Sequence, residues 1–206
     1  MARNFVRPCI ILGVLAVAVA AGGAVAQERP LIAAAQYGDI DSVTALISQG
    51  NDVNERLADG STALHFAAQQ GNAVVAEALI AGGADVDATT RYGVTPLALA
   101  AGNGDAAVAR LLLENGADVD LPSRENQTPL MGAALNGRPE AVGLLLEHGA
   151  DVDAADAWRG QTALMWAAAE GNTRALRLLL DAGADIAAAS QSGFTALLIA
   201  ARNAHV

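Results

Sequence analysis

Residues 95–120 read TPLALAAGNGDAAVARLLLENGADVD, and close copies of this segment recur along the chain. The opening Thr-Pro/Ala-Leu phrase returns at intervals of 33, 33, 34 and 33 residues, at Thr62, Thr95, Thr128, Thr162 and Thr195. The closing Gly-Ala-Asp phrase keeps nearly the same interval, at Gly83, Gly116, Gly149 and Gly183. A fixed period of this length is typical of stacked supersecondary units rather than of a closed globule. The repeat therefore predicts a solenoid, and it favours binding over catalysis.

Each copy has the pattern of two helices joined by a tight turn. Within residues 95–120, Pro96 suits a first helical turn, where its missing N–H would have no partner. The apolar residues that follow share one helical face, and Gly104 can end the helix with a left-handed backbone. A second apolar run over residues 108–112 ends before Gly116. Small residues should let helices of neighbouring copies approach closely; they are Ala67-Ala68, Ala100-Ala101, Ala133-Ala134, Ala167-Ala168 and Ala200-Ala201.

These phrases resemble the ankyrin repeat, whose pattern runs Gly-x-Thr-Pro-Leu-His-x-Ala-Ala-x-x-Gly and then Leu-Leu-x-x-Gly-Ala-Asp-Val-Asn. The resemblance covers residues 30–206 and implies an all-α ankyrin-repeat helical solenoid, with helix-turn-helix plus hairpin-loop units of about 33 residues. It also implies that His65 orients a turn through hydrogen bonds. The chain departs from the pattern where Ala63, Ala163 and Ala196 replace proline, where His65 is replaced in later copies, and where Asn126 replaces the loop glycine.

The sequence divides into a leader over residues 1–26 and one ankyrin-repeat domain over residues 27–206. We expect units near residues 30–56, 57–89, 90–122, 123–156 and 157–189, and an incomplete unit at 190–206. One additional residue between Asp153 and Thr162 should lengthen the loop there. The last unit has apolar residues at Leu197–Ile199 but no second helix to cover them. An alternative is therefore that the chain is the first part of a longer solenoid, or of a larger protein whose activity lies further along.

The first 26 residues have the layout of a secretory signal peptide. Arg3 and Arg7 precede an apolar run, and Ala24-Val25-Ala26 offers small residues for cleavage. The run is also long enough to be considered as an uncleaved anchor, at the threshold of about 18 residues. We expect cleavage, followed by a periplasmic or secreted location. Cleavage would remove Cys9, the single cysteine of the chain, and with it thiol chemistry.

Charge and composition restrict the partners. The formal net charge is −10, which opposes binding to nucleic acid and to anionic membrane surfaces. Hydrophobic residues make up 53% of the chain but aromatic residues only 3%, so exposed aromatic side chains become informative. The sequence predicts a protein partner, with no nucleic acid, no membrane after cleavage and no evident small-molecule substrate.

No residue pattern favours catalysis, a metal or a cofactor. Asp151, Asp153 and Asp156 invite a calcium interpretation, but they lack the loop glycine and bidentate glutamate of calcium loops. Turn chemistry, with aspartate accepting backbone hydrogen bonds, is the simpler reading. His148 stands beside Gly149, where a partly cationic ring favours a helix C-terminus. No histidine has a nucleophile or metal-ligand partner at a suitable spacing, so we expect no enzyme activity.

The candidate protein-binding residues follow from the resemblance, which places partner specificity in loop tips and inner helix ends. At the tips they are Arg91, Tyr92, Arg124, Glu125, Trp158 and Arg159. At the helix ends they are Gln69, Gln70, Asn103, Asn136 and Glu170. Binding hot spots favour Trp, Tyr and Arg. Trp158 could equally pack against the neighbouring hairpin, whereas Trp166, inside a helix, is predicted to fill space between helices. The sequence thus predicts an exported, non-catalytic scaffold that holds a protein partner in a concave groove.

Overall fold

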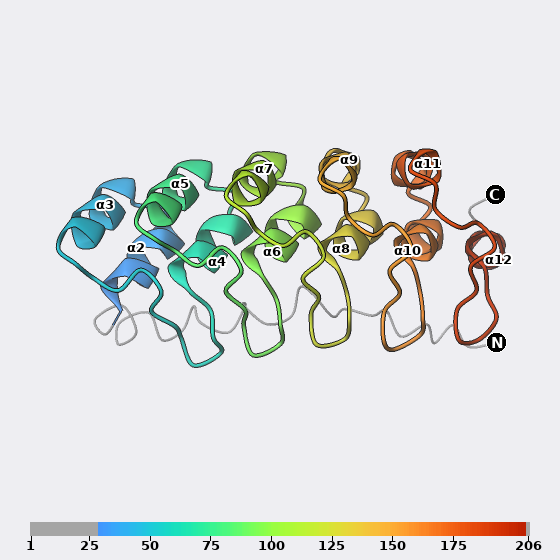
Figure 1. The fold of residues 1–206 in the computed structure, drawn as a ribbon, viewed down its shortest axis with the longest axis horizontal. Helices are drawn as coiled ribbons and strands as arrows, with labels where there is room; N and C mark the ends of the chain where they lie inside the picture. The colour runs from blue at the N-terminus through green and yellow to red at the C-terminus, as the bar shows by residue number, and fades with distance from the viewer. Residues whose placement is uncertain (1–28, 205–206) are drawn as a thin grey trace.

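The computed structural model describes residues 29–204, which form eleven α-helices and no named strand (Figure 1). The predicted leader, residues 1–26, lies outside the described residues. The first helix of each unit belongs to an inner row: α2 (Pro30–Tyr37), α4 (Ala63–Gln69), α6 (Pro96–Asn103), α8 (Pro129–Leu135), α10 (Ala163–Glu170) and α12 (Ala196–Arg202). The second helix belongs to an outer row: α3 (Ile40–Ser48), α5 (Ala73–Ala81), α7 (Ala106–Glu114), α9 (Pro139–Glu147) and α11 (Thr173–Asp181).

Packing follows the order of the units. Each inner helix contacts the inner helix of the next unit, from α2 through α12, and each outer helix contacts the next outer helix, from α3 through α11. The two helices within a unit also pack together. The hairpins project from the inner row on the side away from the outer row (Figure 1). The predicted all-α ankyrin-type solenoid is therefore confirmed.

The core is made of leucines and alanines supplied by adjacent units. Leu64, Leu97 and Leu130 are fully buried, and burying such a side chain contributes roughly 1.5–3 kcal/mol. The predicted alanine pairs in α4, α6, α8 and α10 are also buried. Since an alanine presents only a methyl group, these pairs allow close approach of successive inner helices. Each apolar face is therefore covered by its neighbours, as in other repeat stacks.

Local chemistry sets the ends of the helices as predicted. Thr95 accepts a hydrogen bond from the Ala98 N–H at 3.0 Å, with Pro96 in the first turn of α6. Gly104 ends α6 with φ 86°, a left-handed conformation that glycine adopts without strain. Asn126, which replaces a loop glycine, also adopts positive φ, at 57°. The substitution is tolerated because asparagine visits this region more readily than most residues.

The C-terminal end of the stack exposes apolar side chains. Leu197 and Leu198 are 73% and 51% exposed, whereas Ile199 is buried against the core. The expectation that Leu197–Ile199 are all uncovered is thus wrong for Ile199, because α12 turns this side chain toward α10. Across residues 29–204, no helix combines the length and the hydropathy needed to span a bilayer.

Candidate functional site

The six predicted tip residues lie on three successive hairpins, and we call them the tip ridge: Arg91, Tyr92, Arg124, Glu125, Trp158 and Arg159. Backbone hydrogen bonds join each hairpin to the next. The Arg124 N–H donates to the Tyr92 carbonyl at 3.0 Å, and the Ala157 N–H donates to the Glu125 carbonyl at 2.9 Å. Equivalent bonds connect the ridge to the hairpins on either side. The Arg91 N–H donates to the Asp59 carbonyl, and the Gln191 N–H donates to the Arg159 carbonyl. The ridge is therefore a hydrogen-bonded row rather than a set of independent loops.

The aromatic residues of the tip ridge face solvent. Tyr92 is 40% exposed and Trp158 is 50% exposed, so about half of the Trp158 side chain is covered and the rest is available to a partner. Trp166, by contrast, is only 6% exposed inside α10, which agrees with its predicted packing role. Both exposed rings are covered on one face by an arginine of the same hairpin. The guanidinium carbon lies 4.7 Å from the ring centre in Arg91–Tyr92 and 4.2 Å in Arg159–Trp158.

The additional residue of the fifth unit is Trp158. Other hairpins close between residues four apart, such as Thr90 and Val94, but this one closes between Asp156 and Gln161. Because the Ala157 N–H makes the link that Arg124 makes one unit earlier, Ala157 rather than Trp158 occupies the place of Arg124. The sequence had aligned Trp158 with Arg124, and the backbone register corrects this by one residue. The inserted tryptophan consequently projects from the tip.

Asp156 holds the lengthened hairpin together. Its buried carboxylate accepts hydrogen bonds from the backbone N–H groups of Trp158 at 2.9 Å, Arg159 at 2.7 Å and Gln161 at 3.1 Å. The sequence considered Asp156 beside Asp151 as a calcium ligand. The structure instead uses it as a turn residue, which satisfies three donors that a longer loop would leave unpaired.

The predicted helix-end residues form a second row, separate from the tip ridge. Each inner helix begins directly after its hairpin, so its C-terminal end lies about 10–12 Å away along a helix of seven or eight residues. Several of these amides cap helices. Asn103 donates to the Gln69 carbonyl at 2.9 Å, Asn136 donates to the Gly132 carbonyl at 3.0 Å, and Gln70 donates to the Gln36 carbonyl. Glu170 is exposed at the end of α10.

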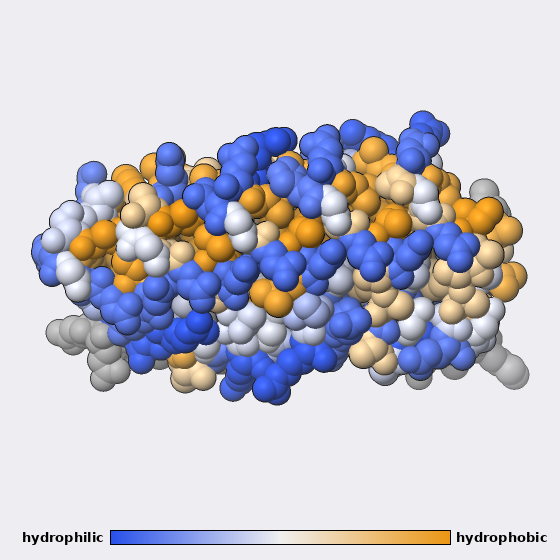
Figure 2. Space-filling view, in the orientation of Figure 1, coloured by the Kyte–Doolittle hydropathy of each residue, from blue (hydrophilic) through white to orange (hydrophobic). Residues whose placement is uncertain are grey.

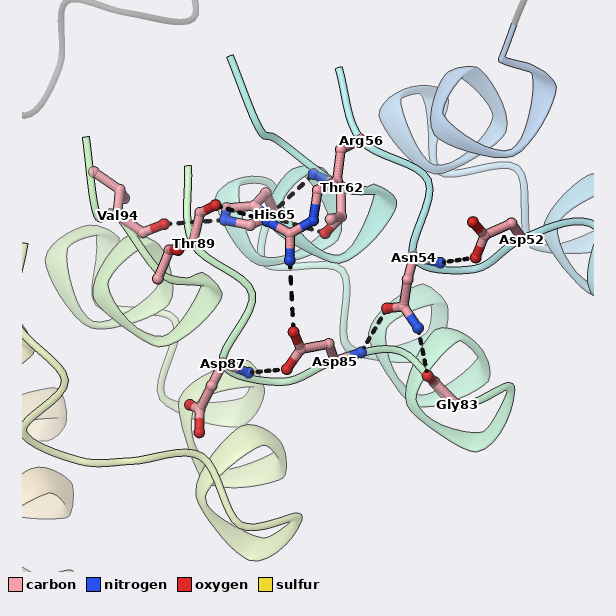
Figure 3. Close-up of polar contacts among 10 residues, drawn as sticks. All are labelled: Asp52, Asn54, Arg56, Thr62, His65, Gly83, Asp85, Asp87, Thr89 and Val94. Carbon is pink, nitrogen blue, oxygen red and sulfur yellow. Dashed lines mark hydrogen bonds and ion pairs between the residues drawn. The ribbon is translucent and has the colours of Figure 1, made fainter. Parts of the chain in front are cut away.

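A ladder of side-chain hydrogen bonds joins the connecting loops, and Figure 3 shows its first steps. Asp85 accepts from the Asp87 N–H at 3.1 Å within its own turn. Asn54, one unit earlier, accepts from the Asp85 N–H at 2.7 Å and donates to the Gly83 carbonyl at 3.0 Å. Sequence reasoning predicted the bond within the turn but missed the bond between units. The constant place of the acidic pair in successive copies was the available signal.

The ladder continues through the later units with aspartate in place of asparagine. Asp87 accepts from the Asp118 N–H at 3.0 Å, Asp120 from the Asp151 N–H at 3.1 Å, and Asp153 from the Asp185 N–H at 2.9 Å. A carboxylate cannot donate, so these steps lack the second bond that Asn54 makes. Partial burial raises the pKa of Asp120. In Figure 2 a hydrophilic band crosses the face in view along the row of connecting loops.

His65 joins the second unit to the third (Figure 3). Its Nδ1 accepts from the Thr62 N–H at 3.2 Å, which leaves Nε2–H to donate to the Val94 carbonyl at 3.0 Å. This agrees with the role implied by the family pattern. Burial lowers the pKa of His65, in keeping with a ring that must stay neutral to accept at Nδ1. At the C-terminal end of α9, the ring Nδ1 of His148 lies 2.9 Å from the Leu144 carbonyl.

Within residues 29–204, His, Asp and Glu side chains form no group of three or more with a metal-binding arrangement. The acidic pairs are spread along the ladder, one in each of the second, third and fourth units, and their oxygens accept backbone N–H groups as described above. His205 lies outside the described residues.

The chain matches the family model described as "Ankyrin repeats (3 copies)" over residues 31–123, 77–156 and 130–206. The chain belongs to the ankyrin-repeat family. Ankyrin repeats are generally protein–protein interaction modules, and proteins built from them are typically non-catalytic scaffolds. No curated protein shows significant sequence similarity to this chain. The family thus supports a protein partner, whose identity it leaves open.

Proposed function

We propose that this ankyrin-repeat protein is an exported, non-catalytic scaffold whose tip ridge and inner helices hold a protein partner. The observation that carries the proposal is the exposure of Tyr92 and Trp158 on the first and third of three successive hairpins in one hydrogen-bonded row. Aromatic residues are only 3% of the chain, so two of them facing solvent beside arginines mark a surface with the composition of a binding hot spot.

The physical basis of binding is preorganisation. The hairpins are tied to one another through backbone hydrogen bonds, such as Arg91 N–H to the Asp59 carbonyl at 2.7 Å. Asp156 further fixes the backbone on both sides of Trp158. A partner therefore meets side chains whose backbone is already ordered, and less of the interaction energy is lost in ordering the site.

Affinity capture tests the proposal. The purified chain would be used to isolate a partner from the cell envelope of its source organism, and the dissociation constant would be measured with variants. We expect Trp158→Ala and Tyr92→Ala each to weaken binding by about thirtyfold, the effect of a ~2 kcal/mol hot spot. Arg159→Ala should weaken it less. Val74→Ala is the control, since Val74 is 61% exposed but lies on α5 of the outer row, away from the hairpins and the inner helices. Unchanged affinity in all three tip variants would show that the tip ridge is not the binding surface.

Export rests on the leader over residues 1–26, with cleavage after Ala26. N-terminal sequencing of the protein recovered from the periplasm and from the medium tests it. A new N-terminus at Gln27 supports cleavage, and recovery of the intact chain in the membrane fraction would favour the uncleaved anchor instead.

A longer solenoid is the second candidate, and one observation favours it. The end formed by α11 and α12 exposes four large apolar side chains: Leu180, Ile186, Leu197 and Leu198. Terminal repeats usually present a polar outer face, so a further helix pair would cover this end. The downstream reading frame tests the idea, because codons that continue the repeat after Val206 would support it and an immediate stop codon would oppose it.

A further inference from the structure

Positive charge gathers on the tip ridge of a strongly acidic chain. The chain has a net charge of −10, yet the six residues of the ridge comprise three arginines and one acid, Glu125. Arg91, Arg124 and Arg159 are all exposed. Many of the acids lie instead on the aspartate ladder, where their oxygens accept backbone N–H groups. The ridge is thus a local reversal of the charge of the protein, and it favours a partner surface of negative charge.

Two of the three guanidinium groups are held in place by aromatic rings. Arg159 stacks on Trp158, and Arg91 stacks on Tyr92 while donating to the Tyr92 hydroxyl at 2.6 Å. Stacking engages the flat face of a guanidinium and leaves N–H groups on its edge free to donate. Those donors match the two oxygens of a carboxylate. The pairs therefore present preorganised carboxylate-binding groups.

A cleft lies on the ridge beside the projecting tryptophan. It has a volume of about 320 Å³ and is lined by Arg124, Glu125, Ala157 and Trp158. The additional residue of this hairpin, Trp158, forms one wall of the cleft. Its walls combine an indole, a methyl group and two charged side chains. Such a cleft accommodates one side chain whose stem is apolar.

The spacing of the hairpins selects an extended ligand. Successive inner helices pack about 8–10 Å apart, and the hairpins repeat with them. A polyproline II segment has three residues per turn and rises about 3.1 Å per residue, so side chains three apart lie on one face about 9 Å apart. Carboxylates three residues apart would thus match Arg91 and Arg124, which occupy equivalent places on successive hairpins; Arg159 occupies the place of Glu125 on the next hairpin.

We propose that the tip ridge binds an extended acidic segment of the partner protein, with carboxylates meeting Arg91, Arg124 and Arg159 and one side chain in the cleft against Trp158. The inference rests on the proposed protein-binding function and names the chemistry of the partner. Glu125, the single acid of the ridge, opposes this ligand and tunes its affinity.

The experiment measures binding of synthetic peptides to the purified chain by calorimetry and by fluorescence of the exposed Trp158. The probes are repeated Glu-Pro-Pro triplets, the same peptide with Gln for Glu, and the same peptide with Lys for Glu. We expect binding of the glutamate peptide alone, weakened by added salt because the contacts are exposed. Equal binding of the glutamine peptide would overturn the inference, and so would absence of binding by the glutamate peptide.

Variants locate the site. Arg124→Gln and Arg159→Gln should each weaken binding of the glutamate peptide by about two- to fivefold, as expected for exposed ion pairs. Glu125→Gln should strengthen it by about two- to fivefold for the same reason. A gain of affinity cannot result from misfolding, so the result for Glu125→Gln can be interpreted even if another variant folds poorly. Arg110→Gln on α7 is the matched control, since it removes one exposed arginine away from the hairpins and should leave binding unchanged.

A single-stranded oligothymidylate tests whether the ridge prefers the phosphates of a nucleic acid to the carboxylates of an acidic protein segment. Tighter binding of this probe than of the glutamate peptide, lost in Arg124→Gln, would assign the ridge to phosphate and overturn the acidic-segment inference. Failure of the proposed function has a different result. In that case neither the acidic peptides nor a captured partner would respond to Trp158→Ala, whereas failure of this inference alone leaves the captured partner sensitive to it.

Discussion

The two halves of the stack are joined by different chemistry. In the first half, Asn54 bonds twice to the second unit and His65 links the second unit to the third. In the second half, Met131 and Met165 occupy the place of His65, and Asp153 occupies the place of Asn54. Apolar packing is shared by both halves, and the second half has other polar links between units, such as the two bonds that Asn172 donates to the Ala134 and Leu135 carbonyls. Because a solenoid is stabilised by interfaces between neighbouring units, unequal interfaces imply unequal local stability.

The ends reinforce this difference. Arg56 ties the first unit to the second unit through the Thr89 carbonyl at 2.9 Å and an ion pair with Asp85. At the other end, Leu197 and Leu198 remain exposed on α12. We therefore expect the helices from α10 onward to open more readily than those of the second and third units.

Paired truncations of the core test this expectation and should produce the largest effects. Leu79 in α5 and Leu179 in α11 occupy equivalent places and are both fully buried. Leu→Ala at either should cost about 2–5 kcal/mol through lost burial and the remaining cavity. Leu179→Ala should open α10–α12 while the first half stays folded, whereas Leu79→Ala should destabilise the first half, where α5 packs between α3 and α7. Hydrogen exchange read by mass spectrometry distinguishes the two patterns, and uniform loss of protection in both variants would contradict the comparison.

Replacing His65 with the methionine of later units should give an intermediate effect. His65→Met leaves the Thr62 N–H and the Val94 carbonyl without this partner, at a cost of about 1–3 kcal/mol. The measurement is urea unfolding at neutral pH, and Met165→Leu is the control because it alters the equivalent place without removing a polar link.

The same variant should change the dependence of stability on pH. Burial lowers the pKa of His65 in the folded protein, so the unfolded chain binds a proton first as the pH falls. The stabilisation by neutral His65 is complete above the ordinary histidine pKa and declines as the pH falls from there toward the lowered folded pKa. His65→Met should lack this decline; an equal decline in both proteins would show that His65 is not its source.

Exchanging the ladder residues between the halves should give the smallest effect. Asp120→Asn can add a donor to the Gly149 carbonyl, as Asn54 does to Gly83, for a gain of about 0.5–1.5 kcal/mol. Asn54→Asp should cost a similar amount by the same argument. Since burial raises the pKa of Asp120, its contribution is most favourable at low pH and is lost as the pH rises through that pKa. Thermal unfolding across this range should show the loss in the original chain and not in Asp120→Asn.

Structural features that depend only on residues close together in the sequence could be predicted from the sequence. The helix caps at Pro96 and Gly104, the positive φ of Asn126 and the longer loop before Thr162 each depend on chemistry within a few residues. The predicted tip residues lie on exposed hairpins, because the hairpin is exposed wherever its unit repeats. The single-residue error at Trp158 arose because an insertion can be placed at several points of a loop without changing the local pattern.

The repeat period was sufficient to establish the family, the solenoid and the candidate tip residues, since periodic hydrophobicity and caps act over one unit at a time. Contacts between units decided the rest. They turned the acidic pairs into a ladder, used Asn103 to cap the preceding inner helix, and placed Trp158 in the wall of a cleft with Arg124 and Glu125. These outcomes depend on which backbone groups of the next unit come within hydrogen-bond distance, and that is settled only when the units stack.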